Sequence, residues 1–219
     1  MREALAQDHL AIANLLLDRG AKADQAAFAI AGGANSVAIL QRLLDGGAEI
    51  DKNNPSPYGY YPSALVVACS KGHVKTVKWL LAKGASFEGN PPLKPALKGG
   101  NDELLKLLLD SGADPNQPSG PDATSPLQHA VILHTYGIRH DPDFSLVRLL
   151  LRHGADPAYN DSRGQHAGKT ALEFLQLRRD QASARANNQD YHPNRQSREA
   201  THVAAMDKLI KLLETHVAE

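Results

Sequence analysis

Histidine is the residue type whose number and spacing in this chain most suggest chemistry. Of ten histidines among 219 residues, His129, His134 and His140 lie within twelve residues of one another. Their spacing does not match the two-histidine helical pattern of hydrolytic zinc sites, and a single cysteine, Cys69, offers no pair for a structural zinc site. Ordinary packing is therefore favoured over metal binding, which stays the alternative, and no metal or other cofactor is expected.

Catalytic patterns are also missing from the sequence. No serine lies in the glycine pattern of a nucleophile elbow, and no glycine-rich loop could cradle a phosphate. Gly32-Gly33 and Gly99-Gly100 are expected in turns between helices, where they need no ligand. The lone Cys69 excludes a disulfide framework and is expected to be a buried thiol. The sequence therefore predicts a protein that is not an enzyme.

Repeated leucine-rich helices are the elements that would position any site. Residues 102–116 read DELLKLLLDSGADPN, and about two-thirds of the helical part is apolar, so such a helix must be covered on two sides. A glycine then ends the helix, and an Asp-Pro-Asn turn follows. A sixth copy, at 209–217, lacks the glycine. The other copies have their glycines at Gly20, Gly47, Gly84, Gly112 and Gly154.

Because this pattern recurs roughly every thirty-odd residues, it indicates a stacked repeat array. A second motif precedes most copies: SPLQHA at 125–130, PPLKPA at 91–96, SALVVA at 63–68 and TALEFL at 170–175. These segments resemble the Thr-Pro-Leu-His-x-Ala start of an ankyrin repeat. KGHVKTVKWLLAKGA, at 71–85, is similar to that family's second helix.

The resemblance covers nearly the whole chain and implies an all-α fold with little regular strand. We expect an ankyrin-repeat solenoid of about six stacked helix-turn-helix units with variable finger loops and an extended C-terminal helical hairpin cap. Aligned on Gly20, the first repeat should begin before residue 1, so either the first repeat is a shortened cap or upstream residues are missing. A single domain, 1–219, is expected, with repeats at about 1–24, 25–51, 52–89, 90–116, 117–158 and 159–219.

Within each unit, Ser or Thr is expected to cap the first helix. Close approach of neighbouring repeats is expected at four small residues, and no unit can bury its own leucines. Gly33, Gly72 and Gly100 are expected to separate first from second helices, and His9 and His73 to have structural roles where second helices begin. The four small residues are Ala31, Ala68, Ala96 and Ala130.

The last two repeats depart from the regular length. His134 to Ser145 enlarges the turn between the helices of repeat five. In repeat six we expect a helix from Thr170 to about Ala186, a loop from Asn187 to Arg195, and a helix from Gln196 to Val217. Capping is favoured over partner binding as the purpose of this polar hairpin.

Composition narrows the class of partner. The net charge is zero and basic residues are dispersed, so neither a nucleic acid nor a membrane is an expected partner. No signal-peptide core and no run of membrane-spanning length occurs. The default location is the cytoplasm, with the reservation that a targeting segment upstream of residue 1 could be missing, and a monomer is expected.

The resemblance implies a protein–protein interaction module whose fingers and first helices form a concave binding face. The alternative is a dedicated inhibitor or immunity-type protein that caps an enzyme's active site. Tyrosines in the long finger NNPSPYGYYP are the leading candidates, although their rings could instead fold back on Ala21–Gln25 or the Phe87 turn. The candidate partner-binding residues are Tyr58, Tyr60, Tyr61, Phe87, Gln117, Gln128, Tyr136, Arg139, Asn160 and Arg163.

Overall fold

A computed structural model of the chain divides into two compact units, an N-terminal unit, Met1–Ala113, and a C-terminal unit, Asp114–Glu219. The single domain expected from the sequence stays a prediction. The structure describes residues 1–22, 24–51, 54–56, 59–89, 91–119, 124–136, 141–160, 169–188, 190 and 192–217.

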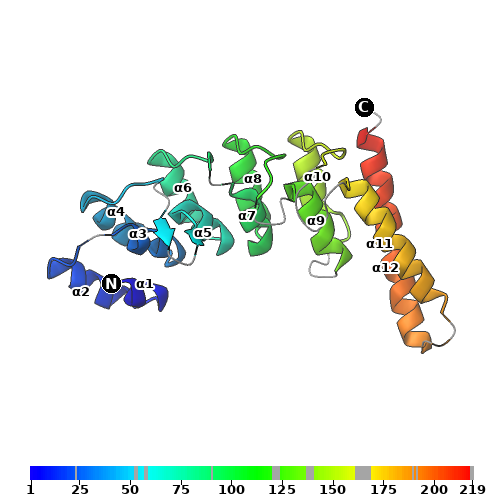
Figure 1. Cartoon of the computed structure of the whole chain (residues 1–219), viewed down its shortest axis with the longest axis horizontal. Coiled ribbons are helices and arrows are strands. Elements are labelled where there is room, and N and C mark those ends of the chain that lie inside the picture. Colours follow the sequence, from blue (N-terminus) through cyan, green and yellow to red (C-terminus); the bar gives the residue numbers. More distant parts are fainter. Residues whose placement is uncertain are drawn as a thin grey trace. The chain divides into compact units, whose positions relative to one another are not determined.

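The N-terminal unit contains four helix pairs, each with a first and a second helix (Figure 1). The first helices α1, α3, α5 and α7 contact one another in order, and the second helices α2, α4 and α6 form another row. At five residues α1 is shorter than the other first helices. The helices are α1 (Arg2–Ala6), α2 (Leu10–Asp18), α3 (Gln25–Gly33), α4 (Val37–Asp45), α5 (Ala64–Ser70), α6 (Val74–Ala82), α7 (Leu93–Gly99) and α8 (Asp102–Asp110).

The C-terminal unit contains the pair α9 (Pro126–Thr135) and α10 (Ser145–Arg152), followed by a long hairpin of α11 (Ala171–Ala186) and α12 (Pro193–Val217). Helix α11 packs on both α9 and α12. The expected hairpin is confirmed, although α12 begins three residues before the expected start, at Pro193. Proline suits a first helical position because its fixed φ is already helical and its missing N–H would have no partner there.

Regular strand is scarce, as expected. In the described ranges it amounts to a hairpin of two three-residue strands, β1 (Asn54–Ser56) and β2 (Gly59–Tyr61), which pair antiparallel in the long finger. The all-α repeat fold is therefore confirmed.

Side-chain caps start several first helices. The hydroxyls of Ser63, Ser125 and Thr170 each accept a backbone N–H three residues on, and the last two complete capping boxes. Helices α1 and α7 begin without a side-chain cap, because their N-cap residues, Met1 and Pro92, have no capping side chain. The caps predicted from Ser and Thr are thus confirmed where those residues occur.

The expectation for the paired glycines was partly wrong. Gly32 and Gly33 lie inside α3, and Gly99 is the last residue of α7. A Cβ on Gly32 would lie 2.3 Å from the carbonyl oxygen of Ala64, so this glycine lets α3 and α5 pack closely. The turn after α3 instead uses Asn35, whose φ is +49°. Of the three glycines expected to separate first from second helices, Gly72 and Gly100 take left-handed φ values after their helices, as expected, and Gly33 does not.

Within each unit, the core lies between the helices of a pair and between neighbouring pairs. Leu108, in α8, is completely buried, and so are the four alanines expected at close contacts, Ala31, Ala68, Ala96 and Ala130. Cys69 is also buried, and that burial raises the pKa of its thiol. The predicted buried thiol is confirmed.

Candidate partner-binding surface

A cavity of about 390 Å³ lies on the surface formed by α1, α3 and α5, which we name the first-helix face. Leu5 and Ala29 are nearly buried in its wall, with 2% and 5% of their surface exposed, whereas Ile30 and Val67 are half-buried. Such a wall offers apolar surface that a docking side chain could cover.

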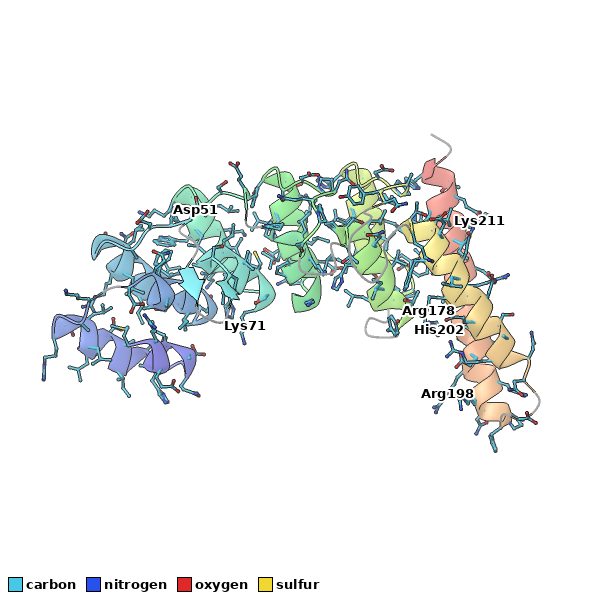
Figure 2. The ribbon with its side chains drawn as sticks, in the orientation of Figure 1. Asp51, Lys71, Arg178, Arg198, His202 and Lys211 are labelled. Atoms are coloured by element: carbon cyan, nitrogen blue, oxygen red, sulfur yellow. The ribbon has the colours of Figure 1, made fainter. Side chains whose placement is uncertain are left out.

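Charged and polar residues surround this apolar wall. Asp8, after α1, and Lys71, after α5, are exposed and carry opposite charges. Figure 2 labels Lys71 at the end of its helix. His73 also borders the cavity, and its Nε2 lies 3.0 Å from the carbonyl oxygen of Gly33, which ties the start of α6 to the end of α3. The structural role predicted for His73 is thereby confirmed. His9 occupies the N-cap position of α2, but it makes no side-chain hydrogen bond to that helix and is exposed.

The long finger of repeat three adjoins the same cavity. Strand β1 contacts α3, and Pro62, the residue after β2, lines the cavity. The backbone of Tyr60 and Tyr61 lies in β2, opposite Pro55 and Asn54. The finger and the first-helix face are therefore neighbours, as the sequence implied. Tyr58 lies outside the described residues.

Neighbouring fingers are joined at their bases by side chains that sequence reasoning missed. In the N-terminal unit, the amide of Ser86 donates to Asp51 Oδ1 at 2.9 Å. In the C-terminal unit, Asn116 Nδ2 donates to the Gly154 carbonyl at 3.0 Å, and its Oδ1 accepts from the amide of Asp156 at 2.7 Å. Asp51 and Asn116 each lie four residues after a helix-ending glycine, and that recurrence could have predicted the links.

Phe87 follows the linked Ser86 and is half-buried. Among the candidates in the C-terminal unit, Gln117 is half-buried, Asn160 is exposed and Tyr136 has 53% of its surface exposed. The remaining two candidates, Arg139 and Arg163, lie outside the described residues. The positions of the four described candidates are compatible with contact to a partner, and the binding role of every candidate stays a prediction.

Gln128 does not fit the role expected from the sequence. Only 4% of its surface is exposed. Its Oε1 accepts the amide of Ser125 at 2.8 Å, and its Nε2 donates to the carbonyl of Lys169 at 2.7 Å. Because this carboxamide is used inside the fold, we exclude Gln128 from the binding surface.

The two described histidines of the cluster, His129 and His134, pack against the fold. His129 is 8% exposed, and His134 packs edge-on against Phe144 with ring centroids 5.1 Å apart. Across the part of the chain that the structure describes, no three His, Cys, Asp or Glu side chains are grouped so as to hold a metal ion. His140 lies outside that part.

Comparison with known proteins identifies the type of repeat. Residues 25–119 match a family model described as ankyrin repeats, in three copies. This part of the chain consists of ankyrin repeats. The matched range contains α3 and α5, which form the first-helix face together with α1. Ankyrin repeats are generally protein–protein interaction modules.

Similar proteins carry the same repeat name. YahD of Escherichia coli, named as an ankyrin repeat protein, is 29% identical over 147 residues, 64% of this chain and 67% of YahD. The human ankyrin repeat and KH domain-containing protein 1 is 39% identical over 66 residues, 28% of this chain and 3% of that protein. The human ankyrin repeat and MYND domain-containing protein 1 is 31% identical over 136 residues, 52% of this chain and 14% of its own length. This ankyrin-repeat chain therefore matches only a small part of the two human proteins.

None of the helices within the described ranges is long and apolar enough to cross a bilayer.

Proposed function

We propose that this ankyrin-repeat protein is a non-catalytic binding module whose partner protein docks on the first-helix face and the adjoining finger of repeat three. The observation that carries the proposal is the cavity of about 390 Å³ between α1, α3 and α5, with Pro62 of the finger in its wall. A finger and a cavity that share a wall can be covered by one partner surface.

The chemistry of the cavity suggests what the partner presents. The half-buried Ile30 and Val67 would be covered by an apolar side chain, while Asp8 and Lys71 would pair with polar groups around it. An apolar centre inside a polar rim is the usual arrangement of protein–protein interfaces. Tyrosines of the finger would add apolar area and hydroxyl groups at a modest entropic cost.

The test begins with a pull-down from native extract and continues with the purified partner. Ile30→Ser should weaken binding at least tenfold, because it removes apolar surface from the cavity. The matched control is Ile12→Ser in α2, which is 50% exposed and does not line the cavity, and it should bind as the unmodified chain does. Equal affinities for the two variants would contradict docking on the first-helix face.

The finger is tested separately. Replacing Tyr58, Tyr60 and Tyr61 together with serine should weaken binding by about 2 kcal/mol, roughly thirtyfold, without changing the helical signal. The triple phenylalanine variant keeps the ring area and should lose much less. Unchanged affinity of the serine variant would remove the finger from the interface.

The inhibitor role, the cellular location and the oligomeric state stay predictions. If the protein is an inhibitor, the recovered partner will be an enzyme whose activity falls when the chain binds. The expected cytoplasmic location and monomeric state are tested by fractionation and by sedimentation of the purified chain.

A further inference from the structure

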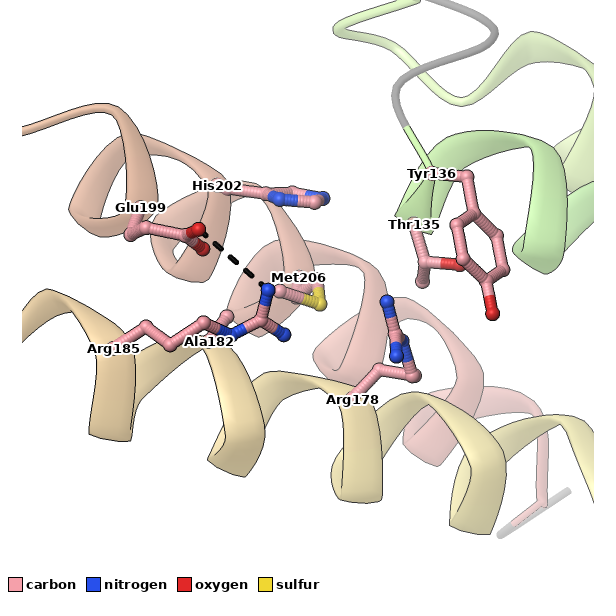
Figure 3. Close-up of a pocket in the computed structure, with 8 residues that line it drawn as sticks. All are labelled: Thr135, Tyr136, Arg178, Ala182, Arg185, Glu199, His202 and Met206. Atoms are coloured by element: carbon pink, nitrogen blue, oxygen red, sulfur yellow. Dashed lines mark ion pairs between the residues drawn. The ribbon is translucent and has the colours of Figure 1, made fainter. Parts of the chain in front are cut away.

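A second cavity, of about 280 Å³, lies within the C-terminal unit, between the end of α9 and the hairpin of α11 and α12 (Figure 3). Its walls combine an aromatic ring, Tyr136, with two arginines of α11 and with polar side chains of α12. Met206 and Ala182 are 3% and 2% exposed and form its apolar part. The cavity shares no residue with the first-helix face.

Arg178 is held in place without a carboxylate partner. Its guanidinium lies 4.6 Å from the centroid of the Tyr136 ring, and its Nη1 donates to Gln181 Oε1 at 3.0 Å. A cation–π contact and one hydrogen bond leave most of the five N–H donors of an arginine for a ligand. No ion pair joins Arg178 to a carboxylate of the described residues, so its charge is not neutralised there.

His202 contributes a buried nitrogen to the same wall. Its Nε2 is shielded from solvent and has no hydrogen-bond partner among the residues that the structure describes. A buried polar atom without a partner is costly, and a ligand oxygen at this place would remove that cost by accepting an Nε2–H. The one carboxylate in the wall, Glu199, is 17% exposed and lies 3.6 Å from Arg185, so it is already paired.

An adjoining cavity of about 510 Å³ shares Glu199 and His202 and extends along the first part of α12. It adds Arg195, and also Arg198, which makes no ion pair with a described residue. Figure 2 shows Arg178, Arg198 and His202 on the hairpin, with Lys211 further along α12. The two cavities together therefore carry an excess of arginines over carboxylates, and their shared wall suits a ligand longer than a single ion.

We propose that these two cavities bind a peptide segment through an oxyanionic side chain, a carboxylate or a phosphate. Arg178 and His202 hold the oxyanion in the smaller cavity, and Arg198 donates to backbone carbonyls of the flanking part of the peptide. Arginine suits this role because its planar fork matches the oxygens of a carboxylate or phosphate.

Binding is measured by fluorescence anisotropy of short labelled peptides added to the whole chain. The peptides share one neutral sequence and differ at one position, which is phosphoserine, glutamate or serine. The phosphoserine or glutamate peptide should bind saturably and the serine peptide at least tenfold more weakly. Inorganic phosphate is a competitor. If it binds as tightly as the anionic peptides, the ligand is a free ion and the peptide proposal is wrong.

Variants locate the site. Arg178→Gln with Arg198→Gln should weaken binding of the anionic peptide at least tenfold. The control, Lys208→Gln with Lys211→Gln, removes the same charge from exposed positions of α12 outside both cavities and should have little effect. Equal losses in the two double variants would mean diffuse attraction and would overturn the proposal, as would no saturable binding up to roughly 1 mM.

Arg178→Lys separates charge from geometry, because it keeps the charge and loses the planar fork. It should weaken binding by several-fold, while far-UV circular dichroism and the melting temperature stay those of the unmodified chain. If the double arginine variant does not fold, the single Arg198→Gln change still tests the site, because Arg198 is exposed and makes no described ion pair. Unchanged binding by both Arg178→Lys and Arg198→Gln contradicts the proposal.

Discussion

Gly32→Ala is a substitution for which local propensity and tertiary packing predict opposite signs. In a helix interior, alanine is favoured over glycine by about 1 kcal/mol, so propensity alone predicts a more stable protein. The new Cβ would lie 2.3 Å from the carbonyl oxygen of Ala64 and 2.9 Å from its carbonyl carbon. Since these are backbone atoms, no side-chain rotation can relieve the contact.

The cost of that contact can be worked from its geometry. Ordinary contacts begin near 3.4 Å, so α3 and α5 must separate by roughly 1 Å at this point. That movement loosens the packing around Ala31 and Ala68, both completely buried. Forced overpacking costs about 1 to 3 kcal/mol, and a backbone clash belongs at the upper end. After the gain in propensity, we expect a net loss of about 2 kcal/mol in the free energy of unfolding.

The assay is urea unfolding followed by far-UV circular dichroism, with Gly33→Ala as the neighbouring control. At Gly33 the closest atom to a new Cβ is a side-chain methyl carbon of Val67, at 3.0 Å, which can move. Gly33→Ala should therefore cost clearly less than Gly32→Ala. If Gly32→Ala is neutral or stabilising, α3 and α5 do not approach as described.

Two further predictions concern the core and the turn before α10. Leu108→Ala should lower the free energy of unfolding by about 2 to 5 kcal/mol. Leu107 is half-buried in the same helix, so Leu107→Ala should lower it clearly less. Equal losses would show that Leu108 is not a core residue. Burial acts to raise the pKa of Asp141, but hydrogen bonds from the Ser145 hydroxyl and amide outweigh it, and the pKa is lowered. The stability from this carboxylate is thus present above its unfolded pKa of about 3.9 and is lost as the pH falls through the lower folded value. Urea unfolding at several pH values measures this effect. The unmodified chain should have a higher free energy of unfolding than Asp141→Asn above the unfolded pKa, and the difference should shrink as the pH falls. A difference that does not change with pH would contradict the stabilising role of the Asp141 carboxylate.

The repeat architecture could be predicted from sequence because its signals are local and recur. Leucines at helical spacing locate α8, the glycine after it marks its end, and Ser125 with Gln128 forms the capping box that starts α9. Each of these features acts within one or two helical turns, so no knowledge of distant contacts was needed. The start of α12 was misplaced because Pro193 can either open a helix or sit in a loop.

Gly32 and Gly33 were misplaced for the opposite reason. A pair of glycines favours a turn by backbone preference, and the preference is overridden here because α5 passes so close to α3 that only glycine fits at position 32. The partner of that contact, Ala64, is 32 residues away in the sequence. Likewise, glutamine is a residue type that usually lies on the surface, and the hydrogen bond from Gln128 to the Lys169 carbonyl, 41 residues away, could not be read from the sequence.

The cavity of the first-helix face could not be predicted, because Leu5, Ile30 and Val67 come from three different repeats and each alone has the pattern of an ordinary core residue. Gly33 shows how packing and binding requirements meet at one position. Its carbonyl receives His73, and a side chain there would press on Val67 in the cavity wall. The backbone carbonyl at this position therefore holds the start of α6, while the absence of a side chain leaves Val67 in place in the cavity wall. The first-helix face is consequently shaped by the same close contacts that hold the repeats together.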